Sequence, residues 1–193
     1  MPQVKELLIE ELQDLLHAET QLTAALPKMA DAAKHFKLKE AFRRHHRETQ
    51  VQIERLKQVI ELLGQKAEPK TCKAMKGLIE EGEQTIADGV DKEALAADLA
   101  LIAAAQKVEH YEIASYGTAH GLARQLGEIE SARLLAQTLG EEQRTDFMLT
   151  AIADPLLQQA MLDDVGGDVN LNAANSKPAS KKAKATRAPT PVS

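Results

Sequence analysis

The segment from Ile102 to Thr118, IAAAQKVEHYEIASYGT, carries the pattern that decides the fold of this chain. Five of its residues recur at intervals of three and four, which is the spacing of one face of an α-helix: Ile102, Ala105, Glu109, Glu112 and Tyr116. Two glutamates therefore occupy the apolar row of a helix that we expect to run from a cap at Asp91 to about Gln125. Carboxylates in such a row need a physical explanation, because apolar rows face the core of a protein.

Three further long helices are predicted from the same kind of apolar spacing. They cover Pro2 to about His35, about Lys39 to Leu63, and about Glu128 to Ala153. A shorter helix is expected between Lys70 and Gly89, and Pro155 is expected to begin a last helical stretch. Four long helices with one long connection, between the second and the third, are typical of a ferritin-like bundle. The predicted fold class is therefore all-α: a ferritin-like four-helix bundle with one long crossover that contains a short helix.

The composition favours helices over sheets. Apolar residues make up 44% of the 193 residues but aromatic residues only 3%, so the core must be built from Leu, Ile, Ala and Met, which form helices readily. The single cysteine, Cys72, excludes an intrachain disulfide and a zinc site made of several cysteines. No apolar stretch resembles a signal peptide or is long enough to cross a membrane, which predicts a cytoplasmic protein with no membrane partner.

The charge is unevenly divided between a body and a tail. Five of the chain's 24 Lys and Arg residues lie between residues 170 and 193, where no acid occurs, so residues 1–169 carry the other 19 cations, all 29 acids and a net charge of −10. We predict a helical bundle over residues 1–165 and a disordered, basic tail rich in Ala, Lys and Pro over residues 166–193. Such a tail could make weak contacts to nucleic acid. The negative body would repel DNA, however, so a purely solubilising tail is the favoured interpretation.

Each of the other long helices also places a carboxylate in its apolar row. Glu19 lies in the row of the first helix, and Glu142 lies in the row of the fourth. In the second helix His45 and Glu48 stack three residues apart, with Thr49 as the alternative inward residue at that turn. Burying unpaired carboxylates is strongly unfavourable. Two arrangements resolve this: the groups hold protons and bond to one another, or they surround cations.

We predict that the carboxylates surround two metal ions. Oxygen ligands with one imidazole suit iron or manganese better than copper, and the facing helices of a bundle supply such ligands. Carboxylates that bridge two ions would neutralise much of the charge of the cluster. The predicted ligands of this dinuclear site are Glu19, His45, Glu48, Glu109, Glu112 and Glu142. His45 has an alternative role as a core histidine bonded to a backbone carbonyl, and Gln52 and Asp146 are expected to support the ligands.

Several segments resemble the YciE/YciF family of bacterial ferritin-like stress proteins. The Ile102–Thr118 segment is the longest of them, and the others are HAETQL at 17–22, HHRET at 45–49, IERL at 53–56, GLIEE at 77–81 and LLAQTLGEE at 134–142. The resemblance covers about residues 3–160. It implies a four-helix ferritin-like domain that forms a homodimer and takes part in stress responses.

The resemblance also implies a metal site, because the wider ferritin-like superfamily binds two iron or manganese ions between its helices. It assigns one ligand to Glu19, one to Glu48, a pair to Glu109 and Glu112, and one to Glu142. The usual Glu-x-x-His pair is absent from this chain, because no histidine has a glutamate three positions before it. The predicted site is therefore richer in carboxylates than is usual in the superfamily.

Two functions fit these observations. In the first, a di-iron site with open positions on adjacent ions oxidises Fe(II) with O2 or peroxide, so that the chain is a ferroxidase or a peroxide-consuming protein. In the second, the chain is a non-catalytic dimeric bundle that acts through protein partners, with or without bound metal. The rate of Fe(II) oxidation separates the two.

Overall fold

The computed structural model describes residues 2–168, and every regular element within them is helical. The four long helices are α1 (Pro2–Ala32), α2 (Phe36–Leu62), α4 (Ala94–Gln125) and α5 (Ile129–Asp168). The connection between α2 and α4 holds α3 (Lys73–Asp88) and a short 3-10 helix, η1 (Gly89–Asp91). This confirms the predicted all-α fold with one long crossover that contains a short helix. No described helix combines the length and the apolar composition that crossing a bilayer requires.

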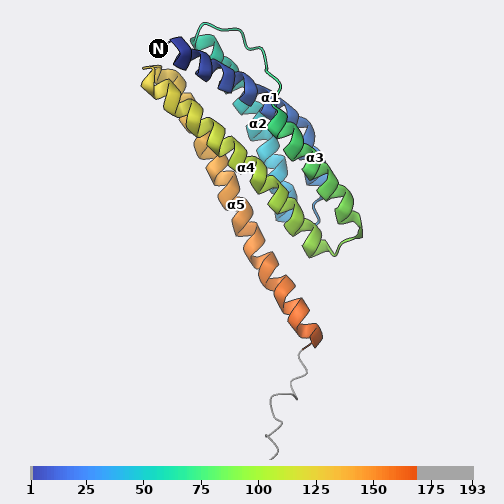
Figure 1. Ribbon diagram of the computed structural model, residues 1–193. Coiled ribbons are helices and arrows are strands. Elements are labelled where there is room, and N and C mark those ends of the chain that lie inside the picture. The colour runs from blue at the N-terminus through green and yellow to red at the C-terminus, as the bar shows by residue number, and fades with distance from the viewer. Residues whose placement is uncertain (1, 169–193) are drawn as a thin grey trace, which may run out of the picture.

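The four long helices lie side by side as an elongated bundle (Figure 1). α1 contacts α2 and α4, and α5 contacts α4 and α2, while α3 covers the outside of α1 and α4. The short connections make α1 antiparallel to α2 and α4 antiparallel to α5. Because the crossover returns the chain to the other end of the bundle, α4 runs parallel to α2. This is the predicted ferritin-like topology.

A carboxylate from α4 determines where α2 begins. The buried side chain of Asp98 accepts hydrogen bonds from the backbone N–H groups of Lys34, at 2.8 Å, and His35, at 2.7 Å. His35 is the N-cap residue of α2 but makes no capping hydrogen bond with its own side chain. Asp98 supplies both the acceptor and the negative charge that the positive end of a helix favours. α2 therefore begins at Phe36, three residues before the predicted start at Lys39.

Two more predicted helix boundaries differ from the structure. Asp91 was expected to cap the third long helix, but it ends η1, and Glu93 is the N-cap residue of α4. A break was expected at Pro155, but α5 continues through it to Asp168, because Ile152 and Leu156 stay buried on the inward side of the helix. α5 thus overlaps the first residues of the predicted tail, and residues 169–193 of that tail lie outside the described residues.

The core of the bundle is divided into two apolar halves by a layer of buried polar side chains. One half is built around Leu22, Phe42, Leu101 and Leu149, and the other around Leu12, Leu56, Tyr116 and Leu135. On each long helix the inward residues between these two halves are polar. This layer, at mid-length of the bundle, contains the carboxylates that the sequence places in apolar rows.

Candidate metal centre

Four side chains from three helices converge in the polar layer. His45 comes from α2, Glu109 and Glu112 come from α4, and Glu142 comes from α5. Each offers one ligand atom, and these atoms all lie within 4.8 Å of one another. Glu109 and Glu112 reach the same place because residues three apart stack on one face of a helix. All four side chains are buried, so the structure brings together four of the six predicted ligands as one group, which we call the ligand cluster.

Glu19 of α1 lies beside the ligand cluster. The hydroxyl of Tyr116 donates a hydrogen bond of 2.5 Å to its Oε1 atom, and its buried Oε2 atom has no hydrogen-bond partner. Burial is the main cause of the raised pKa of Glu109 and of Glu112, and the nearby charge of Glu19 raises both further. This fourth carboxylate therefore belongs to the same electrostatic unit, as the spacing of α1 predicts.

Glu48 is not brought into this group. Its side chain is 33% exposed and points toward Arg44, with 4.0 Å between Nε of Arg44 and Oε1 of Glu48. The buried residues of α2 at this level are His45, Thr49 and Gln52, so Thr49 occupies the inward position that Glu48 was predicted to share. The role of Glu48 as a ligand stays a prediction.

The polar layer leaves an unusual number of buried atoms without hydrogen bonds. Within residues 2–168, ten buried side-chain nitrogen or oxygen atoms have no partner, and all but one of them, Nδ1 of His35, lie in this layer. They are Oε2 of Glu19, both ring nitrogens of His45, Oγ1 of Thr49, Oε1 of Gln52, Oε2 of Glu109, both carboxylate oxygens of Glu112 and Oε2 of Glu142. Buried polar groups are paired in the large majority of cases. Cations would satisfy the oxygens and the imidazole together.

Burial sets the protonation state of His45. It lowers the pKa of the imidazole to about 4, so the ring is neutral at pH 7. Its Nε2 atom lies 3.2 Å from Oε1 of Glu109 and 3.8 Å from Oε2 of Glu142, but neither approach has the geometry of a hydrogen bond. A neutral imidazole with a free ring nitrogen is the form that coordinates a metal ion.

Burial acts in the opposite direction on the carboxyl groups. It raises the pKa of Glu19 to about 8, and it raises the pKa values of Glu109, Glu112 and Glu142 well above the ordinary range. Without cations these groups therefore hold protons near neutral pH. A bound cation would reverse this, because its charge favours the deprotonated ligand. The donor set, mostly oxygen with one nitrogen, fits iron or manganese.

A hydrogen-bonded chain from α2 to α5 holds one of the ligands. Nε2 of Gln52 donates to Oε1 of Glu142 and also, at 3.2 Å, to Oε2 of Glu141. Arg55 donates to both oxygens of Glu141, at 2.7 and 3.0 Å, and at 2.5 Å to Thr138. Gln52 thus contacts Glu142, one of the predicted ligands, and its supporting role stays a prediction. The Arg55–Glu141 pair was not predicted, since nothing in the sequence connects two positions that far apart.

The other predicted supporting residue, Asp146, has different partners. It accepts a hydrogen bond of 3.0 Å from Gln106 of α4, and Nε2 of His110 lies 3.4 Å from its Oδ1 atom. Both contacts lie at the edge of the α4–α5 interface rather than among the ligands. No hydrogen bond or ion pair in the described part of the chain joins Asp146 to the ligand cluster, although its charge contributes to the raised pKa of Glu109.

The fold and the cluster place this chain among the ferritin-like helical bundles, and comparisons with known proteins identify its family. The family described as "Domain of unknown function (DUF892)" matches residues 3–162, and the chain belongs to it. Protein YciF of Escherichia coli (strain K12) is 49% identical over 154 residues, which are 79% of this chain and 92% of YciF. The predicted resemblance to the YciF group is confirmed.

Solved structures agree with this assignment. The crystal structure of the E. coli stress protein YciF matches with a TM-score of 0.78 and 47% identity, covering 82% of this chain and 99% of that chain. The structure of YcfI from Rhodopseudomonas palustris matches with a TM-score of 0.73 and 42% identity, covering 76% of this chain and 92% of that chain.

Proposed function

We propose that this chain is a ferritin-like stress-response protein whose polar layer binds two transition-metal ions, iron or manganese, and that it oxidises Fe(II) with O2 or peroxide. The observation that carries the proposal is the set of unpartnered buried atoms: four carboxylates and an imidazole from four helices, surrounded by apolar core. The description of the E. coli relative as a stress protein supports the physiological part of the proposal.

The residues of the layer have separate tasks in this proposal. His45, Glu109, Glu112 and Glu142 hold the ions, and Glu19 supplies a further oxygen from α1. Bound ions would supply adjacent coordination positions where O2 or peroxide can accept electrons from Fe(II). Gln52 orients Glu142, and the two apolar halves of the core exclude water from both sides of the layer.

The rate of Fe(II) loss in the presence of O2 or hydrogen peroxide tests the oxidation step. We expect the protein to accelerate the loss relative to buffer, and we expect Glu109→Ala to abolish the acceleration. Glu54→Ala, which removes an exposed glutamate of α2 that pairs only with Lys57, is the matched control and should behave like the unaltered chain. A rate equal to that of buffer would refute the oxidase.

The second candidate function is a non-catalytic bundle that acts through protein partners. This function predicts that the chain does not accelerate the oxidation of Fe(II), whether or not its stability depends on bound metal. The proposed homodimer is common to both functions, and light scattering on the purified chain measures it directly.

A further inference from the structure

A shallow groove lies on the surface between α2 and α5. Two surface hollows lie along it, and both are lined in part by Arg44 and Arg47. In one of them the two arginines share the lining with Glu48 and Glu141. In the other, Lys37 and Glu40 join the arginines around the apolar side chains of Met148 and Ile152. We call this surface the basic groove.

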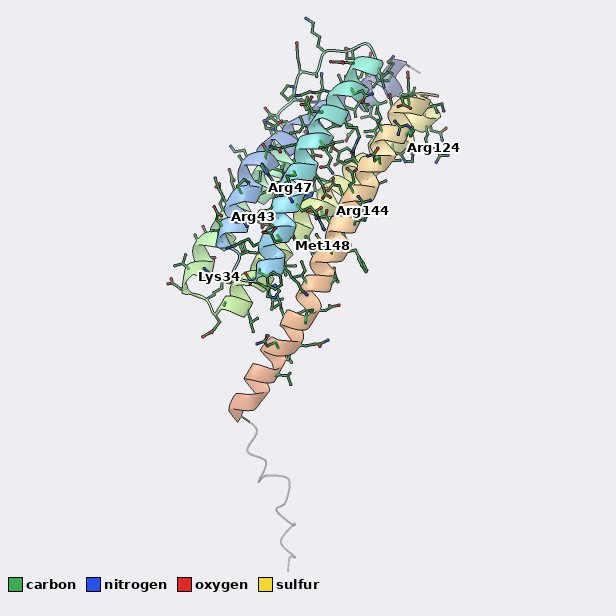
Figure 2. The ribbon with its side chains drawn as sticks, turned by 180° about the vertical axis from the view of Figure 1, so that it is seen from behind. Lys34, Arg43, Arg47, Arg124, Arg144 and Met148 are labelled. Atoms are coloured by element: carbon green, nitrogen blue, oxygen red, sulfur yellow. The ribbon has the colours of Figure 1, made fainter. Side chains whose placement is uncertain are left out.

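The groove concentrates positive charge on a body that is negative overall. Residues 36–47, the first part of α2, contain five Lys or Arg residues and one acid, whereas residues 1–169 together carry a net charge of −10. Three of the eight arginines of the chain lie at this surface: Arg44 and Arg47 on α2, and Arg144 on α5. Figure 2 shows Arg47 and Arg144 on the side where α2 and α5 face the viewer.

Much of this charge has no partner within the protein. Arg43 pairs with Glu40 at 2.8 Å, and Arg44 approaches Glu48 at 4.0 Å. Among the described residues, no carboxylate lies within 4.0 Å of the charged groups of Lys37, Arg47 or Arg144. Unneutralised cations that gather on one surface attract an anionic partner.

Exposed aromatic rings lie beside these cations. Two of the three phenylalanines of the chain are largely exposed, Phe36 at 67% and Phe147 at 74%. Phe36 lines the same hollow as Lys37. Phe147 is three residues from Arg144 on α5, so the two side chains share one face of that helix, but Phe147 lines neither hollow of the groove. In a chain with so few aromatic residues, an exposed ring in the basic groove points to a partner that stacks on it.

We propose that the basic groove binds single-stranded nucleic acid. Arg44, Arg47 and Arg144 would contact phosphates, for which the planar guanidinium group is well suited, and Phe36 and Phe147 would stack on bases. A basic track with exposed rings is the general arrangement that holds single strands without strong sequence preference. A duplex would engage the cations but not the rings, because its bases are stacked inside. A shallow groove also suits a polymer that is contacted along its length.

The test is fluorescence anisotropy of a labelled oligo(dT) of about 20 nucleotides with the full chain. Raising the salt concentration from about 50 to about 200 mM should weaken binding by on the order of tenfold for three phosphate contacts. Arg47→Glu should weaken binding roughly tenfold or more. Phe36→Ala should weaken it about 5- to 100-fold through lost stacking. Circular dichroism checks that these exposed substitutions leave the helices intact.

Arg124→Glu is the matched control. It makes the same change of charge, and Figure 2 shows Arg124 at the far end of α4, away from the basic groove. Because the basic residues beyond 169 are present in every variant, contacts made by them alone would leave all variants equal. Binding that Arg47→Glu and Arg124→Glu weaken equally would overturn the proposal. The proposal would also be overturned if the protein bound duplex DNA as tightly as oligo(dT), or if anionic phospholipid vesicles captured the protein while oligo(dT) did not bind it.

Discussion

Gln52 of α2 donates a hydrogen bond from its side-chain amide to Glu142 of α5, across the polar layer of the bundle. The contact joins two helices that are not consecutive in the chain, and it points one oxygen of Glu142 toward the amide while the other has no partner. Gln52 also links the ligand cluster to Glu141, to which Arg55, one turn further along α2, donates two hydrogen bonds. The orientation of Glu142, a predicted ligand, therefore depends on a neutral residue that is not itself a predicted ligand.

Replacing Gln52 by leucine should weaken metal binding without removing a ligand. Loss of a residue that orients a ligand reduces metal affinity by about 10- to 100-fold in other proteins. Isothermal titration with Mn(II) measures the change. Gln50→Leu, at an exposed position of α2, is the control and should leave the affinity unaltered. Equal affinity in Gln52→Leu would show that Glu142 does not need this contact.

Replacing Glu142 by glutamine should stabilise the metal-free protein at pH 8. Burial and neighbouring carboxylates raise the pKa of Glu142 well above its ordinary value, so its charged form is unfavourable in the folded state. A neutral side chain of the same shape removes that penalty, which we expect to be worth roughly 1–4 kcal/mol. Thermal melts with and without Mn(II) measure both effects. The gain in stability should disappear at pH 5. At pH 8, Mn(II) should no longer raise the melting temperature of the variant.

The metal-free protein should lose stability as the pH rises from about 5 to about 8. Burial raises the pKa of Glu19 from 4.5 to about 8, so over this range the folded chain keeps a proton that the unfolded chain releases. Stability then falls with pH, by on the order of 3 kcal/mol for Glu19 alone. His45 acts oppositely, because its lowered pKa removes stability as the pH falls from 6.5 to about 4. Urea unfolding at several pH values gives the curve, and stability rising from pH 5 to 8 would contradict it.

Removing the carboxylate of Asp98 should destabilise the whole bundle. Its two hydrogen bonds to the backbone before α2 satisfy donors that no other described side chain caps. We expect Asp98→Ala to lower the free energy of unfolding by about 1–3 kcal/mol. Asp88→Ala, at the exposed end of α3, provides the comparison and should change stability by less than about 0.5 kcal/mol.

The spacing of apolar residues predicts the inward positions of the long helices well. Glu109 and Glu112 lie in a row of inward positions that runs from Ile102 to Tyr116. Both glutamates are buried, as their place in this row predicts. Glu19 and Glu142 follow in the same way. A helical row is a local property, so periodicity alone is enough to place these residues.

Features that depend on contacts between distant segments are beyond this kind of prediction. Positions 48 and 49 fit the row of α2 equally well, and only the packing of α2 against its neighbours places Thr49 inward and Glu48 at the surface. The start of α2 depends on Asp98, which lies 64 positions beyond Lys34. The continuation of α5 through Pro155 depends on apolar contacts that offset one lost hydrogen bond.

The number of metal ions bound per chain tests the central claim most directly. The measurement is elemental analysis of the protein after anaerobic loading with Fe(II), or loading with Mn(II), and removal of free metal. The account predicts two ions per chain in the unaltered protein and in Glu54→Ala, and none in a Glu109→Gln, Glu112→Gln variant that circular dichroism shows to be folded. An unaltered chain that retains no metal, or a folded double variant that retains as much as the unaltered chain, would contradict it.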